Sequence, residues 1–543
     1  MFQTLKAWEA PRKLMALAMV YLTILGTTPA YANSSSENTS TPIKHLVVIF
    51  QENVSFDHYF GTYPHASNPP GEPHFHARPG TPTVNGLKGG LLTSNPNLLN
   101  PANGTDASNP FRLDRSQAAT NDQNHAYGPE QSAYAFGLMD LFPKMVGTAG
   151  PPPNAPPLAV TTKGLTMGYF DGNTVTAFWN YAQNFAMSDN SYNTTFGPST
   201  PGLLNLVSGQ TSGVTATLNG TGNETDDGNG GFTVVGDPDP IGDVCSAPTR
   251  GQVTLGSKNI GDLLNEAGVS WGSFMGGFDI TAKNANGTTG CVRSSVSEFT
   301  GTVVDYIPHH AFFQYHTSTS NPQHTRPSSV SEIGHDGAAN HNYDINDFFT
   351  VLKHGNLPAV SFLKAPAFQD GHAGYSDPLD EQAFVVTVIN ALQRSDDWSS
   401  TAVVIAYDDS DGWYDHQMGP IVNQSSSPAD TLTGPEACGN GSSALPGIDS
   451  TTAPHAQGRC GYGPRLPLLV VSPWAKENFV DSTVTDQTSI IRFIEDNWLL
   501  GQRIGQGSFD VLANSISQMF DFKHYRSDSR LFLDPSSGEP TSH

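Results

Sequence analysis

The chain has 543 residues, with 26 Lys and Arg against 50 Asp and Glu, and a formal net charge of −24. Hydrophobic residues make up 37% and aromatic residues 10%, which suffices for a large core and excludes global disorder. The acidic balance argues against nucleic acid or an anionic membrane surface as the partner. The 18 His qualify this, because their protonation near pH 5 would bring the charge to about −6.

The first segment is predicted to be a secretory signal peptide over residues 1–32. Basic residues precede an apolar run from Leu14 to Gly26, and the small-residue pattern of TPAYA follows. This run is shorter than the ~20 residues that a membrane span needs. We therefore expect cleavage after Ala32 and a secreted or periplasmic protein without a stable membrane anchor.

Alternating strand and helix patterns fill the rest of the chain. Short β-branched runs typical of strands buried on both faces occur at 45–50, 269–275, 357–363, 401–407 and 466–472. Helical patterns lie at 261–268, 380–395 and 487–500. The alternation predicts an α/β, doubly wound, mostly parallel sheet flanked by helices. We interpret 33–543 as a single catalytic domain with Gly- and Pro-rich insertions at about 64–110, 210–255 and 421–461.

Four cysteines remain in this exported chain, and an even number favours two disulfides. Three pairings are open. The sequence-local one joins Cys245 to Cys291 and Cys438 to Cys460, and closes two polar loops. The spacings of the cysteines do not match a zinc site.

Polar residues follow two of the predicted strands at the ends where doubly wound sheets place their chemistry. Glu52 and Asn53 follow the first strand, and Asp408 and Asp409 follow the strand at 401–407, with Asp411, Asp415 and His416 close behind. Adjacent carboxylates repel each other unless a cation neutralises them. Their oxygens suit a hard divalent ion such as Ca, Mg or Mn. The alternative is an Asp-rich turn.

Ser199 is the candidate nucleophile. It precedes Thr200-Pro201 and the apolar helical pattern LLNLV, so it is expected at a helix N-terminus. There the free N–H groups and the helix dipole favour an anion, either an alkoxide or a phosphate. An ordinary Ser cap is the competing interpretation.

Histidines cluster in turn-bounded segments rather than on apolar helix faces. These are His125, the pair His309 and His310, and His372. Such side chains suit contacts to phosphate oxygens or proton donation to a leaving group. Zinc binding by His309, His310 and His372 is the alternative.

Seven ordered motifs resemble one known family. They are QENVSFDHYFG, NHAYGPEQ with GLMDLF, FGPSTPG with SGQ, HHAFFQYH, DGHAGYSDP, AYDDSDGWYDH, and VVSPWAKENFV with QTSIIRFIEDNW. From about Ile43 to Glu495 the chain resembles the bacterial phosphoesterase family of phospholipases C and acid phosphatase A, within the alkaline-phosphatase-like superfamily. The resemblance implies one divalent metal ion held by Glu52, Asn53, Ser199, Asp408 and Asp409. It also implies Ser199 as nucleophile and His125, His309, His310 and His372 as phosphate-binding or proton-donating residues.

Departures from the phospholipase pattern bear on the substrate. Val54 stands where those enzymes carry Arg, Ser199 is followed by Pro201-Gly202, Gln487 replaces a last His, and the chain ends soon after the catalytic region. These differences favour an exported phosphatase that hydrolyses phosphate monoesters through a phosphoserine, with an acidic pH optimum. The alternatives are a phospholipase C acting on phosphatidylcholine-type diesters, with transient lipid contact, and a catalytically silent binding protein.

Overall fold

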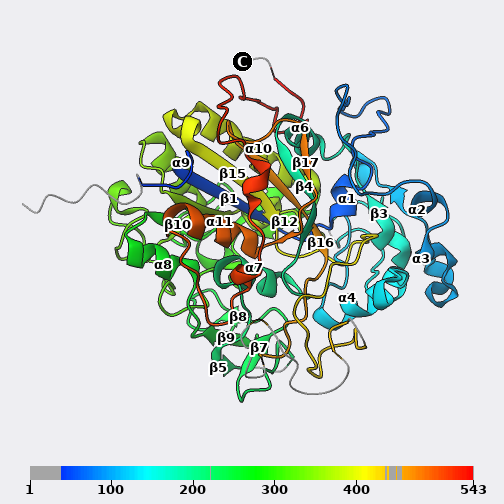
Figure 1. Ribbon diagram of the computed structural model, residues 1–543, viewed down its shortest axis with the longest axis horizontal. Helices are drawn as coiled ribbons and strands as arrows, with labels where there is room; N and C mark the ends of the chain where they lie inside the picture. The colour runs from blue at the N-terminus through cyan, green and yellow to red at the C-terminus, as the bar shows by residue number, and fades with distance from the viewer. Residues whose placement is uncertain are drawn as a thin grey trace, which may run out of the picture. The chain divides into compact units, whose positions relative to one another are not determined.

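The structure is a computed structural model that describes residues 38–153, 155–219, 222–434, 437–439, 448 and 455–541. The predicted signal peptide lies outside the described residues, as does part of the 421–461 insertion. The element order follows an α/β pattern, and a large sheet occupies the centre of the ribbon in Figure 1.

The central sheet has nine strands, with the spatial order β13-β10-β14-β1-β15-β16-β4-β17 and β18 also paired with β4. Their bounds, in that order, are β13 Asn342–Asp344, β10 Trp271–Met275, β14 Val360–Lys364, β1 His45–Gln51, β15 Thr401–Tyr407, β16 Arg465–Val471, β4 Ala186–Tyr192, β17 Phe479–Asp481 and β18 Thr485–Asp486. Every pairing is parallel except those of β16, which runs antiparallel to β15 and β4. The predicted α/β class with a mostly parallel sheet is confirmed.

The five predicted strands all belong to this sheet. The hydrophobic runs of β1 and β15 are buried along nearly their whole length, as expected of parallel strands covered on both faces. β16 is the exception in direction, and its pairing with β4 shifts register between Leu466 and Leu468. Pro467 lies at that shift and has no N–H for the ladder, which explains why the strand is irregular there.

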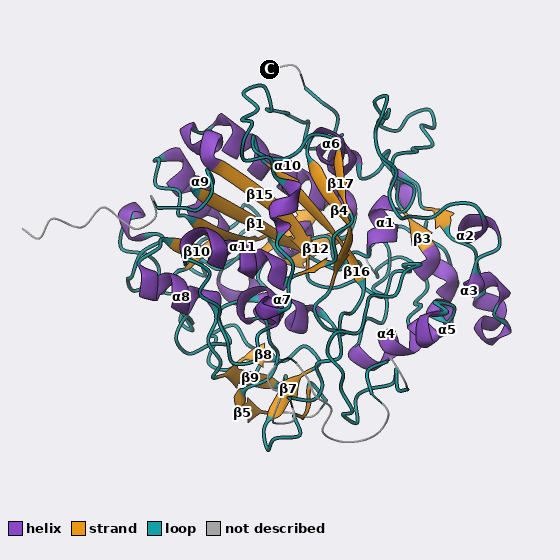
Figure 2. Cartoon of the chain, viewed as in Figure 1, coloured by secondary structure: helices purple, strands orange, loops and turns teal. Residues whose placement is uncertain are grey.

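Helices form two layers around the sheet. In one layer α7 (Ser199–Ser208) contacts both α8 (Ile260–Ala267) and α11 (Thr488–Trp498), and in the other α10 (Pro378–Arg394) contacts α6 (Thr176–Asn184) and α9 (Ile345–Lys353). Figure 2 shows these helices around the strands. The helices predicted at 261–268, 380–395 and 487–500 are α8, α10 and α11. Within the described residues, no helix combines the length and the apolar character needed to cross a membrane.

Smaller elements occupy the peripheral segments. Residues 64–110 hold α2 (Gly90–Thr93) and α3 (Pro96–Leu99); α1 (Phe56–Phe60) precedes them, and α4 (Tyr127–Tyr134) and α5 (Phe142–Met145) follow. The 210–255 insertion folds into short strands: β5 Val214–Leu218, β6 Glu224–Asp226, β7 Phe232–Val234, β8 Asp239–Pro240 and β9 Gln252–Leu255. The remaining strands pair in twos: β2 Phe111–Arg112 with β3 Gly168–Tyr169, and β11 Ser294–Ser297 with β12 Gly301–Val304.

Two disulfides tie the peripheral loops. Cys245 is joined to Cys291 and Cys438 to Cys460, each with a Cα–Cα distance of 5.3 Å. The sequence-local pairing is therefore the one that forms. Each bond closes a loop, and a cross-link of this kind stabilises the fold by lowering the conformational entropy of the unfolded chain.

Candidate active site

The site lies where β1 and β15 end beside the start of α7. Ser199 is the first residue of α7 and is buried. Its Oγ lies 2.8 Å from Oε2 of Glu52, which follows β1, and 3.3 Å from Oδ2 of Asp409, which follows β15. The Ser199 side chain makes no capping bond to its own helix, so it differs from the ordinary Ser cap. The structure thus brings the predicted nucleophile to the predicted carboxylates.

Two local features permit this close approach. Asn53 adopts a left-handed backbone (φ 62°), a conformation that Asn tolerates better than most residues, and its N–H donates to Oδ1 of Asp408 at 3.0 Å. Gly202 lets α7 come close to the end of β15, because a Cβ there would lie 2.1 Å from the Asp408 carbonyl oxygen. Strain of this kind at a strand end is typical of functional sites.

Gln487, one of the departures from the family pattern, supports the end of β15. Its Nε2 donates to the carbonyl oxygens of Tyr407 and Asp408, at 3.1 and 2.6 Å, and its Oε1 accepts the Thr194 N–H. Its side-chain amide therefore holds backbone in place.

Two charged residues that sequence reasoning missed complete the carboxylate cluster. Lys364, the last residue of β14, is buried; its Nζ is bonded to Oε1 of Glu52 and lies 3.7 Å from Oδ2 of Asp408. Asp370 lies 3.8 Å from Nδ1 of His310. A lysine at the end of an otherwise apolar predicted strand was the available signal for Lys364. Asp370 is the first residue of the motif DGHAGYSDP, in which only His372 was predicted as a site residue.

Burial and mutual repulsion dominate the electrostatics of this cluster. Burial, then the Asp408 charge, raises the pKa of Glu52 well above its usual range, although Lys364 opposes the shift. Burial also raises the pKa of Asp409 well above its usual value and that of Asp370 to about 8. Burial works against the charge of Lys364, but Glu52 and Asp408 outweigh it and raise its pKa. The cluster therefore carries more buried negative charge than Lys364 alone offsets.

The donor set fits a hard divalent cation. Two carboxylate oxygens converge on the Ser199 hydroxyl, which has one hydrogen to give. Within the described part of the chain, Oδ1 of Asn53 and Oδ2 of Asp408 are buried without a hydrogen-bond partner. Buried oxygen atoms left unsatisfied in this way are what an oxygen-ligated ion would occupy.

The four predicted histidines form a chain of neighbouring rings next to this cluster. The ring centroids of His309 and His310 are 4.4 Å apart, those of His310 and His372 are 6.4 Å apart, and those of His372 and His125 are 5.7 Å apart. Nδ1 of His310 lies 3.2 Å from Oε1 of Glu52. Segments that are far apart in the sequence thus contribute neighbouring histidines to one row of rings beside Glu52.

The environments of these histidines differ. Burial lowers the pKa of His310, with His309 adding to the effect, and burial lowers the pKa of His372. Burial also opposes the charge of His125, but Asp409 and hydrogen bonds to Asp122 and Asp411 raise its pKa.

The zinc alternative needs His309, His310 and His372 around one point. In the described chain their nitrogens do not form one group within 4.8 Å; His310 groups with Glu52 and Asp370, whereas His372 groups with His125, Asp122 and Asp411.

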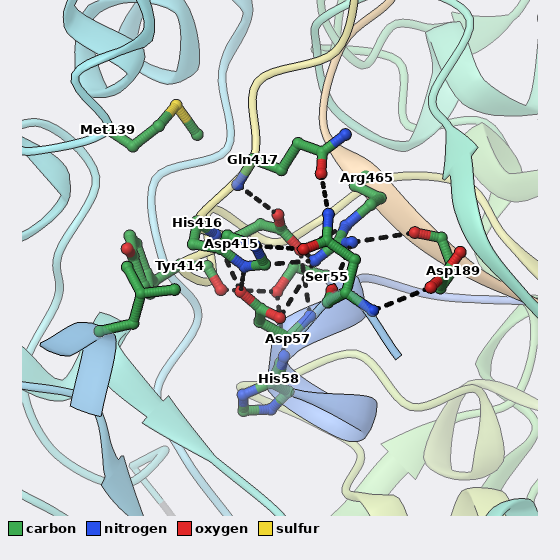
Figure 3. Close-up of polar contacts among 12 residues, drawn as sticks. Ser55, Asp57, His58, Met139, Asp189, Tyr414, Asp415, His416, Gln417 and Arg465 are labelled. Atoms are coloured by element: carbon green, nitrogen blue, oxygen red, sulfur yellow. Dashed lines mark hydrogen bonds and ion pairs between the residues drawn. The ribbon is translucent and has the colours of Figure 1, made fainter. Parts of the chain in front are cut away.

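Asp415 and His416, which follow the second strand end in sequence, belong to a separate polar cluster (Figure 3). Arg465, the first residue of β16, is fully buried and donates to Oδ1 of Asp57 at 3.1 Å and to Oδ2 of Asp415 at 3.1 Å. His416 Nδ1 lies 2.6 Å from Oδ2 of Asp57. Since Glu52 and Asn53 lie just before α1, and Asp408 and Asp409 begin the 408–415 segment, this cluster fixes the two strand ends relative to each other.

Arg465→Lys is expected to lower the free energy of unfolding by about 2 kcal/mol, because a lysine keeps the charge but loses hydrogen bonds of the planar fork. Arg465 also donates to the carbonyl oxygens of Asn85 and Asp189, at 2.7 and 2.9 Å. Urea unfolding measures the effect, and Arg530→Lys, at an exposed position, is the control. Equal stability of the two variants would contradict a clamping role for Arg465.

A cavity of about 690 Å³ opens beside His125. Its lining includes Asp122, His125, Tyr127, Pro198, Asp237 and Arg250. Pro198 directly precedes Ser199, so the cavity adjoins the nucleophile. Its walls carry both charge signs, together with apolar side chains such as Val235 and Ala429.

Comparison with known proteins gives a family match over most of the chain. The model of the Phosphoesterase family matches residues 43–501. Non-hemolytic phospholipase C of Burkholderia pseudomallei is 28% identical over 86% of this chain and 57% of its own length. Non-hemolytic phospholipase C of Pseudomonas aeruginosa is 24% identical over 84% of this chain and 54% of its own. The chain thus spans a little over half the length of these two relatives.

A further curated relative and two solved structures also match the chain. Phospholipase C A of Mycobacterium tuberculosis is 24% identical over 86% of this chain and 74% of its own length. Among solved structures, murine ectonucleotide pyrophosphatase / phosphodiesterase 5 matches with a TM-score of 0.30 and 12% identity, over 64% of this chain and 95% of that chain. A protein in the alkaline phosphatase superfamily from Vibrio parahaemolyticus matches with a TM-score of 0.27 and 11% identity, over 82% of this chain and 90% of that chain.

Proposed function

Because the chain belongs to the Phosphoesterase family, we propose that it is an exported phosphoric ester hydrolase in which Ser199 is the nucleophile. One observation carries this proposal: the Ser199 Oγ is held between carboxylate oxygens of Glu52 and Asp409 at the N-terminus of α7. A hydroxyl placed against two buried acceptors can lose its proton to them, and the helix N-terminus favours the resulting negative charge.

The proposed reaction has two displacements at phosphorus. The Ser199 oxygen attacks, its proton passes to a neighbouring carboxylate, the Oγ–P bond forms, and the bond from phosphorus to the leaving oxygen breaks. The leaving oxygen takes a proton from a histidine of the adjoining cluster, and His125 is placed for this because it lines the cavity beside Pro198. Water then attacks phosphorus and gives a proton to the now neutral histidine, the Oγ–P bond breaks, and Ser199 regains its proton from the carboxylate.

Glu52, Asn53, Asp408, Asp409 and Ser199 would hold the divalent ion. When bound, this ion would neutralise the buried carboxylates and stabilise negative charge on the phosphoryl oxygens. Among the histidines, His310 has an Nε2 atom that is buried without a partner in the described residues, and it is available to a phosphoryl oxygen.

The relatives favour phosphodiesters of the phospholipid type over the monoesters expected from the sequence departures. The relatives reported above are named phospholipase C. Gln487, one of the departures, is engaged with backbone carbonyl oxygens, so its replacement of a histidine bears on the position of Asp408 more directly than on the substrate. We therefore propose phospholipase C-type hydrolysis first and monoester hydrolysis second.

An acidic pH optimum remains a prediction from the histidine content. The lowered pKa values of His310 and His372 work against it, since each group needs a lower pH than an ordinary histidine to become protonated.

Turnover of nitrophenyl phosphocholine is expected to exceed that of nitrophenyl phosphate by about tenfold or more in kcat/KM, a difference of about 1.4 kcal/mol in transition-state binding. Parallel assays with the same metal-loaded protein measure the ratio. A ratio below one would reverse the order and restore monoesters as the main substrate. The Ser199→Ala variant serves as the control and should hydrolyse neither compound.

A further inference from the structure

Four large apolar side chains project into solvent from two adjoining segments near the cavity. Leu99 of α3 is 66% exposed, and Phe136 and Leu138, in the turn after α4, are 66% and 65% exposed; Leu98 of α3 is also exposed. We call these four residues the outer apolar patch. Single exposed Leu residues are ordinary, whereas a group of this kind marks a contact surface.

Hydrogen bonds hold the two segments of the patch together. Asn97 of α3 donates to the carbonyl oxygen of Met139 at 2.7 Å and accepts the Phe142 N–H at 2.9 Å. The turn itself is strained, because Ala135, Phe136 and Met139 all have left-handed backbones, with φ of 45°, 57° and 50°. A bulky residue such as Phe rarely adopts this conformation. The turn thus presents Phe136 outward at a cost in local conformational energy.

The outer apolar patch lies at the opposite end of helix α4 from the cavity that His125 lines. Helix α4 begins two residues after His125 and leads, over about 12 Å, to the turn that carries Phe136. The segment 429–434 runs alongside α4. Ala429 lines the cavity, and Gly434 lies next to the Phe136 ring, since a Cβ at Gly434 would be 3.4 Å from Cε1 of Phe136. Thr431 joins this segment to α4 through its Oγ1, which donates to the Gly128 carbonyl oxygen.

We propose that the outer apolar patch docks the protein on a zwitterionic phospholipid bilayer, with the cavity at the other end of α4. This inference rests on the proposed function in one respect, since a phospholipid substrate requires that the site meet a membrane. Leu and Phe side chains suit shallow burial at the boundary between headgroups and acyl chains. The net charge of −24 would be repelled by anionic lipid, and Asp140, next to the patch, is bonded to Asn100 rather than to a cation. The charges therefore favour zwitterionic lipid.

Vesicle binding tests the proposal apart from catalysis. In a Ser199→Ala background, which leaves the lipid intact, the full chain is expected to cosediment with phosphatidylcholine vesicles. The double variant Phe136→Ser/Leu138→Ser is expected to reduce the partition coefficient at least fivefold. The matched control is Val292→Ser/Val296→Ser, which removes two exposed valines at and beside β11 and should leave binding within twofold of the parent.

The outcomes separate the docking surface from the proposed function. Absence of vesicle binding by the Ser199→Ala protein, equal binding by both double variants, or tighter binding to phosphatidylglycerol than to phosphatidylcholine would overturn the docking proposal. The same patch substitutions with Ser199 present should leave hydrolysis of soluble nitrophenyl phosphocholine unchanged while lowering hydrolysis of vesicle lipid. Failure of the parent to hydrolyse the soluble ester would instead refute the proposed function.

Discussion

Ser199→Ala is expected to lower kcat on phosphate esters by a factor of about 10⁴ or more, because the substitution removes the only atom placed to attack phosphorus in the proposed mechanism. The hydroxyl lies 2.8 Å from Glu52 and 3.3 Å from Asp409, and these contacts vanish with it. Steady-state kinetics on a soluble ester measure the loss. Mass spectrometry of acid-quenched parent protein should detect a phosphoryl group on the peptide that contains Ser199, and the variant should lack it.

Ser208→Ala is the matched control, since Ser208 is a buried serine at the far end of the same helix. Its Oγ donates to backbone, toward the carbonyl oxygens of Leu204 and Gln210 at 2.8 and 2.9 Å. This variant should lose some stability but keep kcat within about threefold, because surrounding backbone contacts persist. A Ser199→Ala protein as active as Ser208→Ala would refute the serine mechanism.

The sequence predicted the strands that are made of continuous apolar residues and missed those that are not. β1 and β15 are β-branched runs and were recognised as buried strands. β4 has the sequence AMSDNSY, so its polar side chains hide its place inside the sheet. Its burial arises from neighbouring strands and peripheral loops, which a local pattern does not contain.

In the site too, residues that follow a predicted strand could be found from the sequence, whereas contacts between distant segments could not. Glu52, Asn53, Asp408 and Asp409 could be predicted, because the ends of parallel strands meet at one edge of the sheet. That Ser199 contacts Glu52 and Asp409 depends on the approach of α7 at Gly202, which is a tertiary contact. Asp415 and His416 were adjacent in sequence to the site, yet Arg465 draws them into another cluster. Proximity in the sequence alone therefore does not define the site.

Lys364→Met is expected to lower the free energy of unfolding of chelated protein by about 3–5 kcal/mol, because it leaves buried carboxylates without their cation. Lys364 is bonded to Glu52 and lies 3.7 Å from Oδ2 of Asp408, and it is buried with both. Urea unfolding in the presence of a chelator measures the change. Lys353→Met, at an exposed position near the end of α9, is the matched control and should change stability by less than about 0.5 kcal/mol.

A divalent ion should reduce the loss of unfolding free energy caused by Lys364→Met, which connects this prediction to the proposed metal site. Bound metal adds positive charge to the same carboxylates, so it replaces part of what Lys364 supplied, and it stabilises the folded state by mass action. We therefore expect the difference between Lys364→Met and the parent to shrink when Ca²⁺, Mg²⁺ or Mn²⁺ is added in excess of chelator. A deficit of the same size with and without metal would show that Lys364 and the ion do not act on a common set of charges. Because Lys364 already offsets one negative charge at Glu52 and Asp408, one divalent ion at the proposed site would balance the remaining charge of Glu52, Asp408 and Asp409.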